Sequence, residues 1–379
     1  MSSLADLQQF GQSVWLDFIK RSLMSDGKLD RLIREDGVRG LTSNPSIFEK
    51  AIAESSEYEA ELRRLANRYS DAKTIFEQLA IADIRAAADV FRAVYDRTAG
   101  RDGLVSLEVS PNLSRDVDGT LHEARRLWHA VGRDNLMIKV PGTPEGIVAF
   151  ETLMSEGINV NVTLLFSINV YREVAAAYIR AISKLAANGG DVQRAASVAS
   201  FFVSRVDTSV DALIEQKLSS ADSAKRKELE GLLGKAAIAN AKLAYEQYTE
   251  LFASAEWKRL RSLGASPQRV LWASTGTKNP KYRDVVYVEE LVGPDTVNTM
   301  PPATMDAFRD HGIARPSLTE GLDEAKTTFH CLQKNGISID DVTAQLLEDG
   351  QRQFAEAFAK MMAAVSRARE NVANIEATQ

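Results

Sequence analysis

Short apolar runs alternate along this chain with longer segments in which apolar residues recur at helical spacing. The apolar runs are short and rich in β-branched side chains, so they predict strands, and the segments between most of them predict amphipathic helices. Alternating strands and helices indicate parallel βαβ units, and eight units make a closed (β/α)8 barrel. The expected strands are Val14–Phe18, Val38–Ser43, Leu104–Val109, Leu136–Val140, Ile158–Leu164, Val198–Val203, Val270–Ala273 and Val297–Met300.

The two faces of these strands favour a barrel over an open sheet. Side chains alternate between faces along a strand, so the run "INVNVTL" places polar and apolar residues on opposite sides. An open doubly wound sheet is covered by helices on both faces and would be apolar throughout. A barrel whose inner face turns polar at the carboxyl ends of its strands fits better. The alternative, a solvent-facing antiparallel sheet, does not explain the intervening helices. On one face of this run lie Asn159, Asn161 and Thr163, and on the other Ile158, Val160, Val162 and Leu164.

Two segments exceed what a plain barrel needs. Residues 211–264 are too long for one crossover, so we expect extra helices between strands six and seven. Residues 339–375 predict a long helix after the last strand. The expected architecture is therefore one α/β domain over residues 1–379, a (β/α)8 TIM barrel with these two helical additions.

Composition narrows the class of protein. The 379 residues are 45% hydrophobic and 26% charged, with a net charge of −6, which is ordinary for a globular protein and argues against nucleic-acid or anionic membrane partners. The one cysteine, Cys331, cannot form an intrachain disulfide, and no apolar run approaches the ~20 residues of a membrane span. We expect a soluble cytoplasmic protein without nucleic-acid or membrane partners. Monomer and homodimer both remain open.

The polar residues expected on the inner face of the barrel form a set that could carry out a reaction. A lysine amine in a dry pocket has a lowered pKa and can attack a carbonyl carbon, while nearby carboxylates can move protons. This combination suggests imine formation on a ketose. The alternative is that Lys139 serves only as the structural partner of a carboxylate. The set comprises Asp17, Thr42, Asn44, Glu108, Lys139, Asn161 and Thr163.

Other chemistries lack the residues they require. No GxGxxG motif follows an expected strand, and the Gly-containing stretch at Gly231 lacks the spacing of a Walker motif. We therefore predict neither a metal nor a cofactor. The histidines that show no metal-ligand spacing are His122, His129, His311 and His330.

A phosphate site is the second candidate. Arg205 follows strand six in "SFFVSR", and the loop after strand seven, "STGTKNP", contains Ser274 and Lys278. Barrels frequently bind phosphate at the loops after their late strands. Alternatively, Arg205 forms an ion pair with Asp207 or Asp211, and Lys278 is a solvated loop lysine.

Six ordered motifs resemble those of the transaldolase family: "GLTSNPSIFEKAI", "VSLEVSP", "MIKVPGT", "INVNVTLLFS", "ASFFVSR" and "LWAST". The resemblance spans most of the chain. It implies a (β/α)8 barrel of the pentose phosphate pathway that transfers a dihydroxyacetone unit through a lysine Schiff base and an enamine. The donors would be sedoheptulose 7-phosphate or fructose 6-phosphate, and the acceptors glyceraldehyde 3-phosphate or erythrose 4-phosphate.

The resemblance also implies a role for each matched residue. Lys139 would be the Schiff base lysine and Asp17 the acid/base at the hydroxyl next to the cleaved bond, while Glu108 and Thr163 would position and activate a water. The remaining matched residues would bind substrate: Thr42, Asn44, Asn161 and Ser200 the ketose, Phe202 as a wall, and Arg205 and Ser274 the phosphate.

One position departs from the pattern. Many members of the family have an arginine two residues after the serine that corresponds to Ser274, where this chain has Gly276. The nearest cation is Lys278, so either this lysine substitutes through a longer loop or the phosphate is bound less tightly. Two other functions stay open: a Schiff base aldolase that releases free dihydroxyacetone, and a non-catalytic barrel that binds sugar phosphates.

Overall fold

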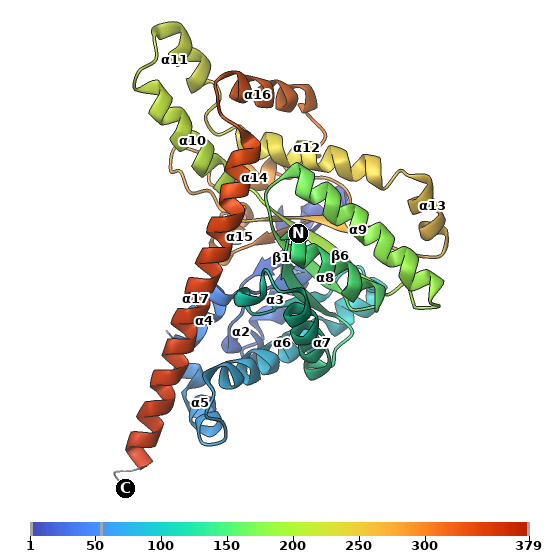
Figure 1. Cartoon of the computed structure of the whole chain (residues 1–379), viewed down its shortest axis with the longest axis vertical. Helices are drawn as coiled ribbons and strands as arrows, with labels where there is room; N and C mark the ends of the chain where they lie inside the picture. Colours follow the sequence, from blue (N-terminus) through green and yellow to red (C-terminus); the bar gives the residue numbers. More distant parts are fainter. Residues whose placement is uncertain (1–2, 54–55, 377–379) are drawn as a thin grey trace.

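Eight parallel strands close into a barrel in which each strand pairs with the next and β8 pairs with β1 (Figure 1). This computed structural model describes residues 3–53 and 56–376. The predicted (β/α)8 barrel is thereby confirmed. The strands are β1 (Gln12–Asp17), β2 (Gly40–Thr42), β3 (Leu104–Glu108), β4 (Leu136–Pro141), β5 (Val160–Leu165), β6 (Ser197–Phe202), β7 (Arg269–Ala273) and β8 (Thr296–Met300).

Helices surround the barrel and include both predicted additions. Between β6 and β7 the chain forms α10 to α13, and after β8 it ends in the long α17. The helices are α1 (Ser3–Asp6), η1 (Leu7–Phe10), α2 (Arg21–Ser25), α3 (Lys28–Glu35), α4 (Pro45–Ala53), η2 (Ser56–Tyr58), α5 (Glu59–Ala66), α6 (Ala72–Arg97), η3 (Pro111–Leu113), α7 (Val117–Val131), α8 (Pro144–Ser155), α9 (Ile168–Ala187), α10 (Ser204–Leu218), α11 (Ser223–Glu230), α12 (Ala236–Leu251), α13 (Ala255–Ser262), α14 (Val286–Glu289), α15 (Pro302–His311), α16 (Leu322–Lys334) and α17 (Ile339–Glu376).

The strict alternation expected along β5 was wrong at Leu164. This residue has a left-handed φ of 59°, and the register between β5 and β6 shifts between Val162 and Leu165. Such an irregularity turns a side chain away from the face that alternation assigns to it. The side chain of Leu164 accordingly lies against Gly350 of α17.

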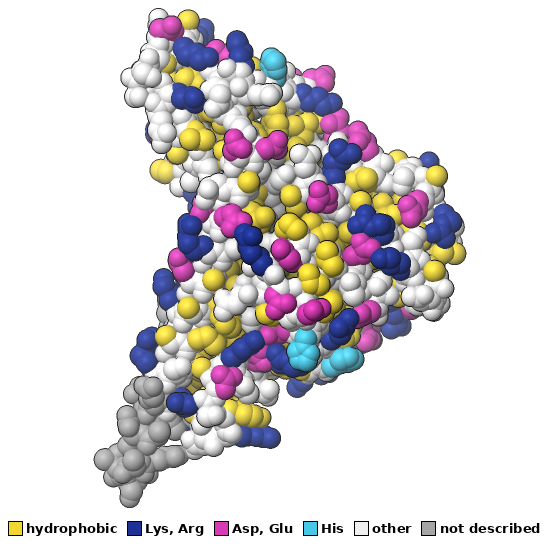
Figure 2. Space-filling view, in the orientation of Figure 1, with side chains coloured by type: hydrophobic (Ala, Val, Ile, Leu, Met, Phe, Trp, Pro, Cys, Tyr) yellow, Lys and Arg dark blue, Asp and Glu magenta, His cyan; other side chains and the backbone are white. Residues whose placement is uncertain are grey.

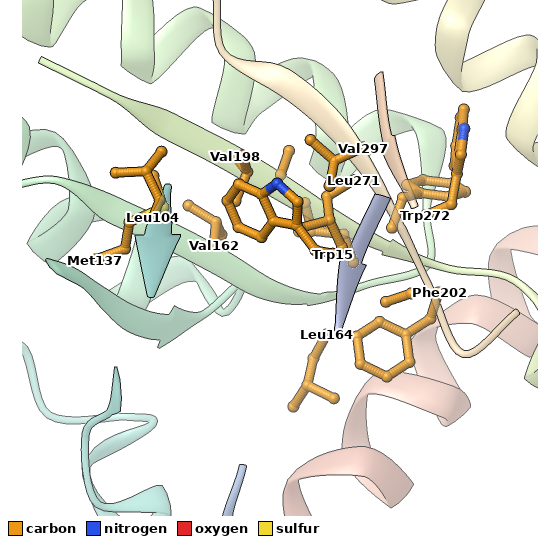
Figure 3. Packing of buried hydrophobic residues seen from close by; sticks show 14 of the residues in the cluster. Trp15, Leu104, Met137, Val162, Leu164, Val198, Phe202, Leu271, Trp272 and Val297 are labelled. Carbon is orange, nitrogen blue, oxygen red and sulfur yellow. The ribbon is translucent and has the colours of Figure 1, made fainter. Parts of the chain in front are cut away.

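The barrel interior is packed with side chains around Trp15. Figure 3 shows Trp15 close to Val198, Leu271 and Val297, which come from three other strands. Gly40 on β2 makes room for the indole, because a Cβ at this position would lie 2.5 Å from the ring. The interior is therefore a solid core rather than a pore, as in other barrels of this size.

Helix α17 runs along one side of the molecule and is drawn in red in Figure 1. It packs against α4, α5, α6 and α10 and also contacts β5. In Figure 3, the pale red helix passes beside Leu164 and Phe202, which lie at the carboxyl ends of their strands. The C-terminal helix thus lies against the mouth of the barrel.

The molecular surface shown in Figure 2 carries basic and acidic side chains interspersed over the same regions. Within residues 3–53 and 56–376, no helix is both long and apolar enough to cross a bilayer.

We predict that Gly40→Ala destabilises the protein, because the added methyl group would overlap the Trp15 ring in a closely packed interior. Overpacking of this kind typically costs about 1–3 kcal/mol. Urea unfolding would measure the loss. The control is Gly231→Ala at the exposed end of α11, where a Cβ would make only ordinary contacts. Equal stability of the two variants would contradict the packing argument.

Candidate active site

Lys139 and Glu108 form a buried ion pair at the barrel mouth. In the parallel register, Glu108 lies beside Lys139, and Lys139 lies beside Asn161. Lys139 Nζ is 3.3 Å from Glu108 Oε2, and both side chains are only 6% exposed. The amine also donates a hydrogen bond of 3.2 Å to the carbonyl oxygen of Ser43. The lysine on β4 therefore has a carboxylate partner on the neighbouring strand β3.

Asp17 is the second carboxylate at this level. Its Oδ1 accepts a hydrogen bond of 2.7 Å from Thr42 Oγ1, and Thr42 Oγ1 lies 2.7 Å from Thr299 Oγ1 on β8. Strands β1, β2 and β8 are thereby linked through three side chains. Thr299 was not among the predicted site residues, although alternation along "TVNTM" places it on the inner face with Val297.

Burial dominates the titration of both carboxylates. It raises the pKa of Glu108 to about 7, with the charge of Asp17 adding to the rise and the charge of Lys139 opposing it. Burial also raises the pKa of Asp17, against the opposing charge of Lys139 and the hydrogen bond from Thr42. Buried carboxyls with raised pKa values beside a lysine are typical of groups that exchange protons.

Asn161 lies in a chain of hydrogen bonds across three strands. Its Nδ2 donates to Ser106 Oγ at 3.1 Å, and its Oδ1 accepts from Ser200 Oγ at 2.7 Å. The amide orientation is thus fixed from both sides. The predicted residues Asn161 and Ser200 thus lie together, and Asn161 lies beside Lys139 in the register.

Two loops after strands hold their polar residues rigidly. Asn44 precedes α4, and its Oδ1 accepts a hydrogen bond of 3.0 Å from the Ile47 N–H, while its amide N–H groups have no hydrogen-bond acceptor among residues 3–53 and 56–376. After β4, the Gly142 N–H donates to the carbonyl oxygen of Thr163 at 2.7 Å. Thr143 then caps α8 through a bond from the Gly146 N–H. These contacts fix the ends of the strands from which the site is built.

Thr163 presents a buried oxygen without a hydrogen-bond partner. Within the described chain, Thr163 Oγ1 takes part in no hydrogen bond, whereas Glu108 Oε2 is paired with the Lys139 amine. Unsatisfied buried polar atoms cost about 1–3 kcal/mol each. Such a cost is usually tolerated where the atoms have a function.

A second polar cluster lies at the end of β6 and β7. The Arg205 guanidinium lies 5.4 Å from the centre of the Phe202 ring, and burial lowers the pKa of this arginine. Ser204 Oγ lies 3.0 Å from Ser274 Oγ, and the Ser204 N–H donates to the Ser274 carbonyl oxygen. Ser274 has a left-handed φ of 56°, an uncommon conformation for a serine. The cluster lies at the N-terminus of α10, where anions bind favourably.

The ion pair considered for Arg205 does not form. Asp207 accepts hydrogen bonds from the Ala237 N–H and the Tyr287 hydroxyl, and Asp211 accepts from the Gly234 N–H and the Tyr282 hydroxyl. Among residues 3–53 and 56–376, Arg205 has no salt-bridge partner within 4.0 Å. Its charge therefore remains available to an anion.

Lys278 occupies a different environment from Arg205. It is exposed and lines a cavity of about 190 Å³ together with three carboxylates of α10, Asp207, Asp211 and Glu215. These negative charges compete with any bound phosphate for the lysine.

Helix α17 contributes a residue that the sequence did not indicate. Phe354 is 6% exposed, and its ring centre lies 5.7 Å from Lys139 Nζ. An aromatic residue at helical spacing carries no signal that distinguishes this contact from ordinary core packing.

No group of three or more His, Cys, Asp or Glu side chains is arranged to hold a metal ion anywhere in the described residues. The carboxylates of the site instead face the lysine and hydroxyl groups.

A closed parallel barrel with charged side chains at the carboxyl ends of its strands belongs to the (β/α)8 class of proteins. The family model described as transaldolase/fructose-6-phosphate aldolase matches residues 14–365. The chain therefore belongs to this family.

Curated relatives named transaldolase match the chain over nearly its whole length. The protein from Thiobacillus denitrificans is 48% identical over 365 residues, which is 96% of this chain and 100% of the relative. That from Trichodesmium erythraeum is 46% identical over 95% of each chain. That from Neisseria gonorrhoeae is 46% identical over 96% of this chain and 99% of its own.

We predict that ionisation of Glu108 lowers stability as the pH rises. Because the folded pKa of about 7 exceeds the ordinary value of 4.5, the folded state holds the proton more tightly. The contribution of Glu108 is therefore fully present below about pH 4.5 and is lost as the pH rises through about 7. The total loss by linkage is at most about 3 kcal/mol.

Urea unfolding of the wild type and of Glu108→Gln between pH 4.5 and 8 tests this prediction. The free energy of unfolding of the wild type, taken relative to that of Glu108→Gln, should fall as the pH rises over this range. A difference that is independent of pH would show that the carboxyl has no raised pKa.

Proposed function

We propose that this protein is a transaldolase that forms a Schiff base with its ketose donor through Lys139. The observation that carries the proposal is the buried pairing of the Lys139 amine with Glu108 at 3.3 Å, beside a second carboxyl, Asp17. Membership of the family and relatives that carry the transaldolase name along their whole length support the same activity. The substrates would be the phosphorylated ketoses and aldoses named above.

Imine formation is the first step. As the amine of Lys139 attacks the ketone carbon, protonated Glu108 gives its proton to the ketone oxygen and then takes a proton from the nitrogen. Glu108 next gives this proton to the new hydroxyl, which leaves as water, so that the nitrogen becomes an iminium and Glu108 a carboxylate. A group with a pKa of about 7 can do both at neutral pH. Thr163, whose hydroxyl is buried beside this site, would hold the water.

Cleavage of the carbon–carbon bond follows. Asp17 removes the proton from the hydroxyl next to the bond, the electron pair moves toward the iminium nitrogen, and an aldehyde leaves. The enamine that remains on Lys139 then attacks a second aldehyde, and Asp17 returns the proton to the new hydroxyl. Thr42 holds the Asp17 carboxylate in one orientation through its 2.7 Å bond.

Binding of the sugar and its phosphate uses the remaining residues. Thr42, Asn44, Asn161 and Ser200 would hold the ketose hydroxyls. Arg205 and Ser274 would take the phosphate at the N-terminus of α10, with the Phe202 ring beneath the guanidinium. Lys278 would contribute a weaker, longer-range attraction.

We also infer a cytoplasmic location, in keeping with the cysteine content.

We expect Lys139→Met to fold but to lose transfer by several orders of magnitude, because the covalent route is removed. Methionine preserves the length of the side chain in the buried site. The assay follows formation of sedoheptulose 7-phosphate from fructose 6-phosphate and erythrose 4-phosphate. The control is Lys326→Met, which removes an exposed lysine on α16. Undiminished transfer by Lys139→Met would refute the Schiff base.

Arg205→Ala should raise the KM for phosphorylated donors by about 10–100-fold, because a charged hydrogen bond contributes about 1.5–3 kcal/mol. The slow reaction with unphosphorylated fructose should change little. We expect a smaller effect from Lys278→Ala, since carboxylates surround this lysine. Equal losses on both sugars would show that Arg205 supports the fold and does not bind phosphate.

Dialysis against EDTA should leave transfer unchanged, because the proposed chemistry uses only a lysine and carboxyl groups. A loss that divalent cations restore would instead indicate a metal-dependent aldol cleavage.

A further inference from the structure

One face of α17 carries Gly350, Phe354 and Phe358, which are four residues apart and therefore lie one above the other along the helix. Each lies against a different part of the molecule. A Cβ at Gly350 would lie 2.9 Å from Leu164 Cδ2 and 3.8 Å from Arg205 Nη1. The Phe358 ring packs edge-on against Phe76 of α6, with ring centres 6.0 Å apart. Phe354, between them, lies over the amine of Lys139.

Phe354 has no group that could take part in proton transfer or hydrogen bonding. Its ring is nevertheless held 5.7 Å from the Lys139 nitrogen and is 6% exposed. Within residues 3–53 and 56–376, no other aromatic ring has this relation to Lys139. The Phe202 ring instead lies against the Arg205 guanidinium and Phe166. One apolar side chain from the last helix therefore lies over the reactive nitrogen.

We propose that Phe354 is a specificity-determining residue that keeps water from the enamine on Lys139 and thereby favours transfer of the three-carbon unit over its release. This inference rests on the proposed function.

The enamine has two competing fates. In transfer, its nucleophilic carbon forms a bond with the carbonyl carbon of an aldehyde, whose oxygen takes the proton from Asp17. In release, the same carbon takes a proton from water or an acid and the lysine becomes an iminium. Water then adds to the iminium carbon, the carbon–nitrogen bond breaks, and free dihydroxyacetone and the amine are regenerated.

The apolar Phe354 ring over the Lys139 nitrogen disfavours release of dihydroxyacetone. Excluding bulk water from the enamine carbon removes the proton source for release. The water that Thr163 would hold still hydrolyses the iminium of the transfer product.

The test uses Phe354→Ala and Phe354→Leu with fructose 6-phosphate and erythrose 4-phosphate. Free dihydroxyacetone and sedoheptulose 7-phosphate are measured in the same reaction. We expect the ratio of release to transfer to rise about tenfold in Phe354→Ala, a change of about 1.4 kcal/mol in relative barrier height, and by less in Phe354→Leu. Leucine retains part of the apolar cover, and it carries the test if the alanine variant does not fold.

Met361→Ala is the matched control. Met361 is also buried on α17, at 1% exposure, so this variant loosens the packing of the helix without touching Lys139. Its ratio should equal that of the wild type. An unchanged ratio in both Phe354 variants, or an equal rise in Met361→Ala, would overturn the role of Phe354.

The result for the wild-type protein distinguishes a failure of this inference from a failure of the proposed function. A wild type that releases dihydroxyacetone and transfers none would refute the transaldolase activity. A wild type that transfers normally, with Phe354 variants that do the same, would refute only the inference.

Discussion

The buried ion pair between Lys139 and Glu108 is the constraint on which the rest of the site depends. Removing two charges from water is costly unless their geometry is good, and the parallel register of β3 and β4 supplies that geometry. Asp17 adds a second carboxyl to the same pocket, and its charge contributes to the raised pKa of Glu108. The three ionisable groups thus lie together in one buried site, where the charge of Lys139 opposes the rise in the pKa of both carboxyls.

The strands and their faces were largely predictable because alternation of side chains along a strand is a local property. Alternation alone assigns Asp17, Glu108, Lys139 and Asn161 to the inner face. The prediction failed at Leu164, where a left-handed backbone conformation interrupts the alternation. Nothing in "NVTLLF" marks that position, because apolar residues occupy both faces around it.

The cover of the site could not be predicted, since it depends on where a distant helix packs. The sequence predicted that α17 is long and helical, but its position across the barrel mouth follows from packing against α4, α6 and α10. Gly350 permits the close approach, because it has no side chain to meet Leu164. Phe354 then reaches the lysine. A similar limit applies to Lys278, whose surrounding carboxylates come from α10.

The measurement that most directly tests the central claim is the location of the covalent adduct. The wild type would be incubated with fructose 6-phosphate, reduced with borohydride, digested and analysed by mass spectrometry. We expect one reduced three-carbon unit, located on the peptide that contains Lys139. An adduct on a different lysine, or turnover of the sugar with no adduct at all, would contradict the account.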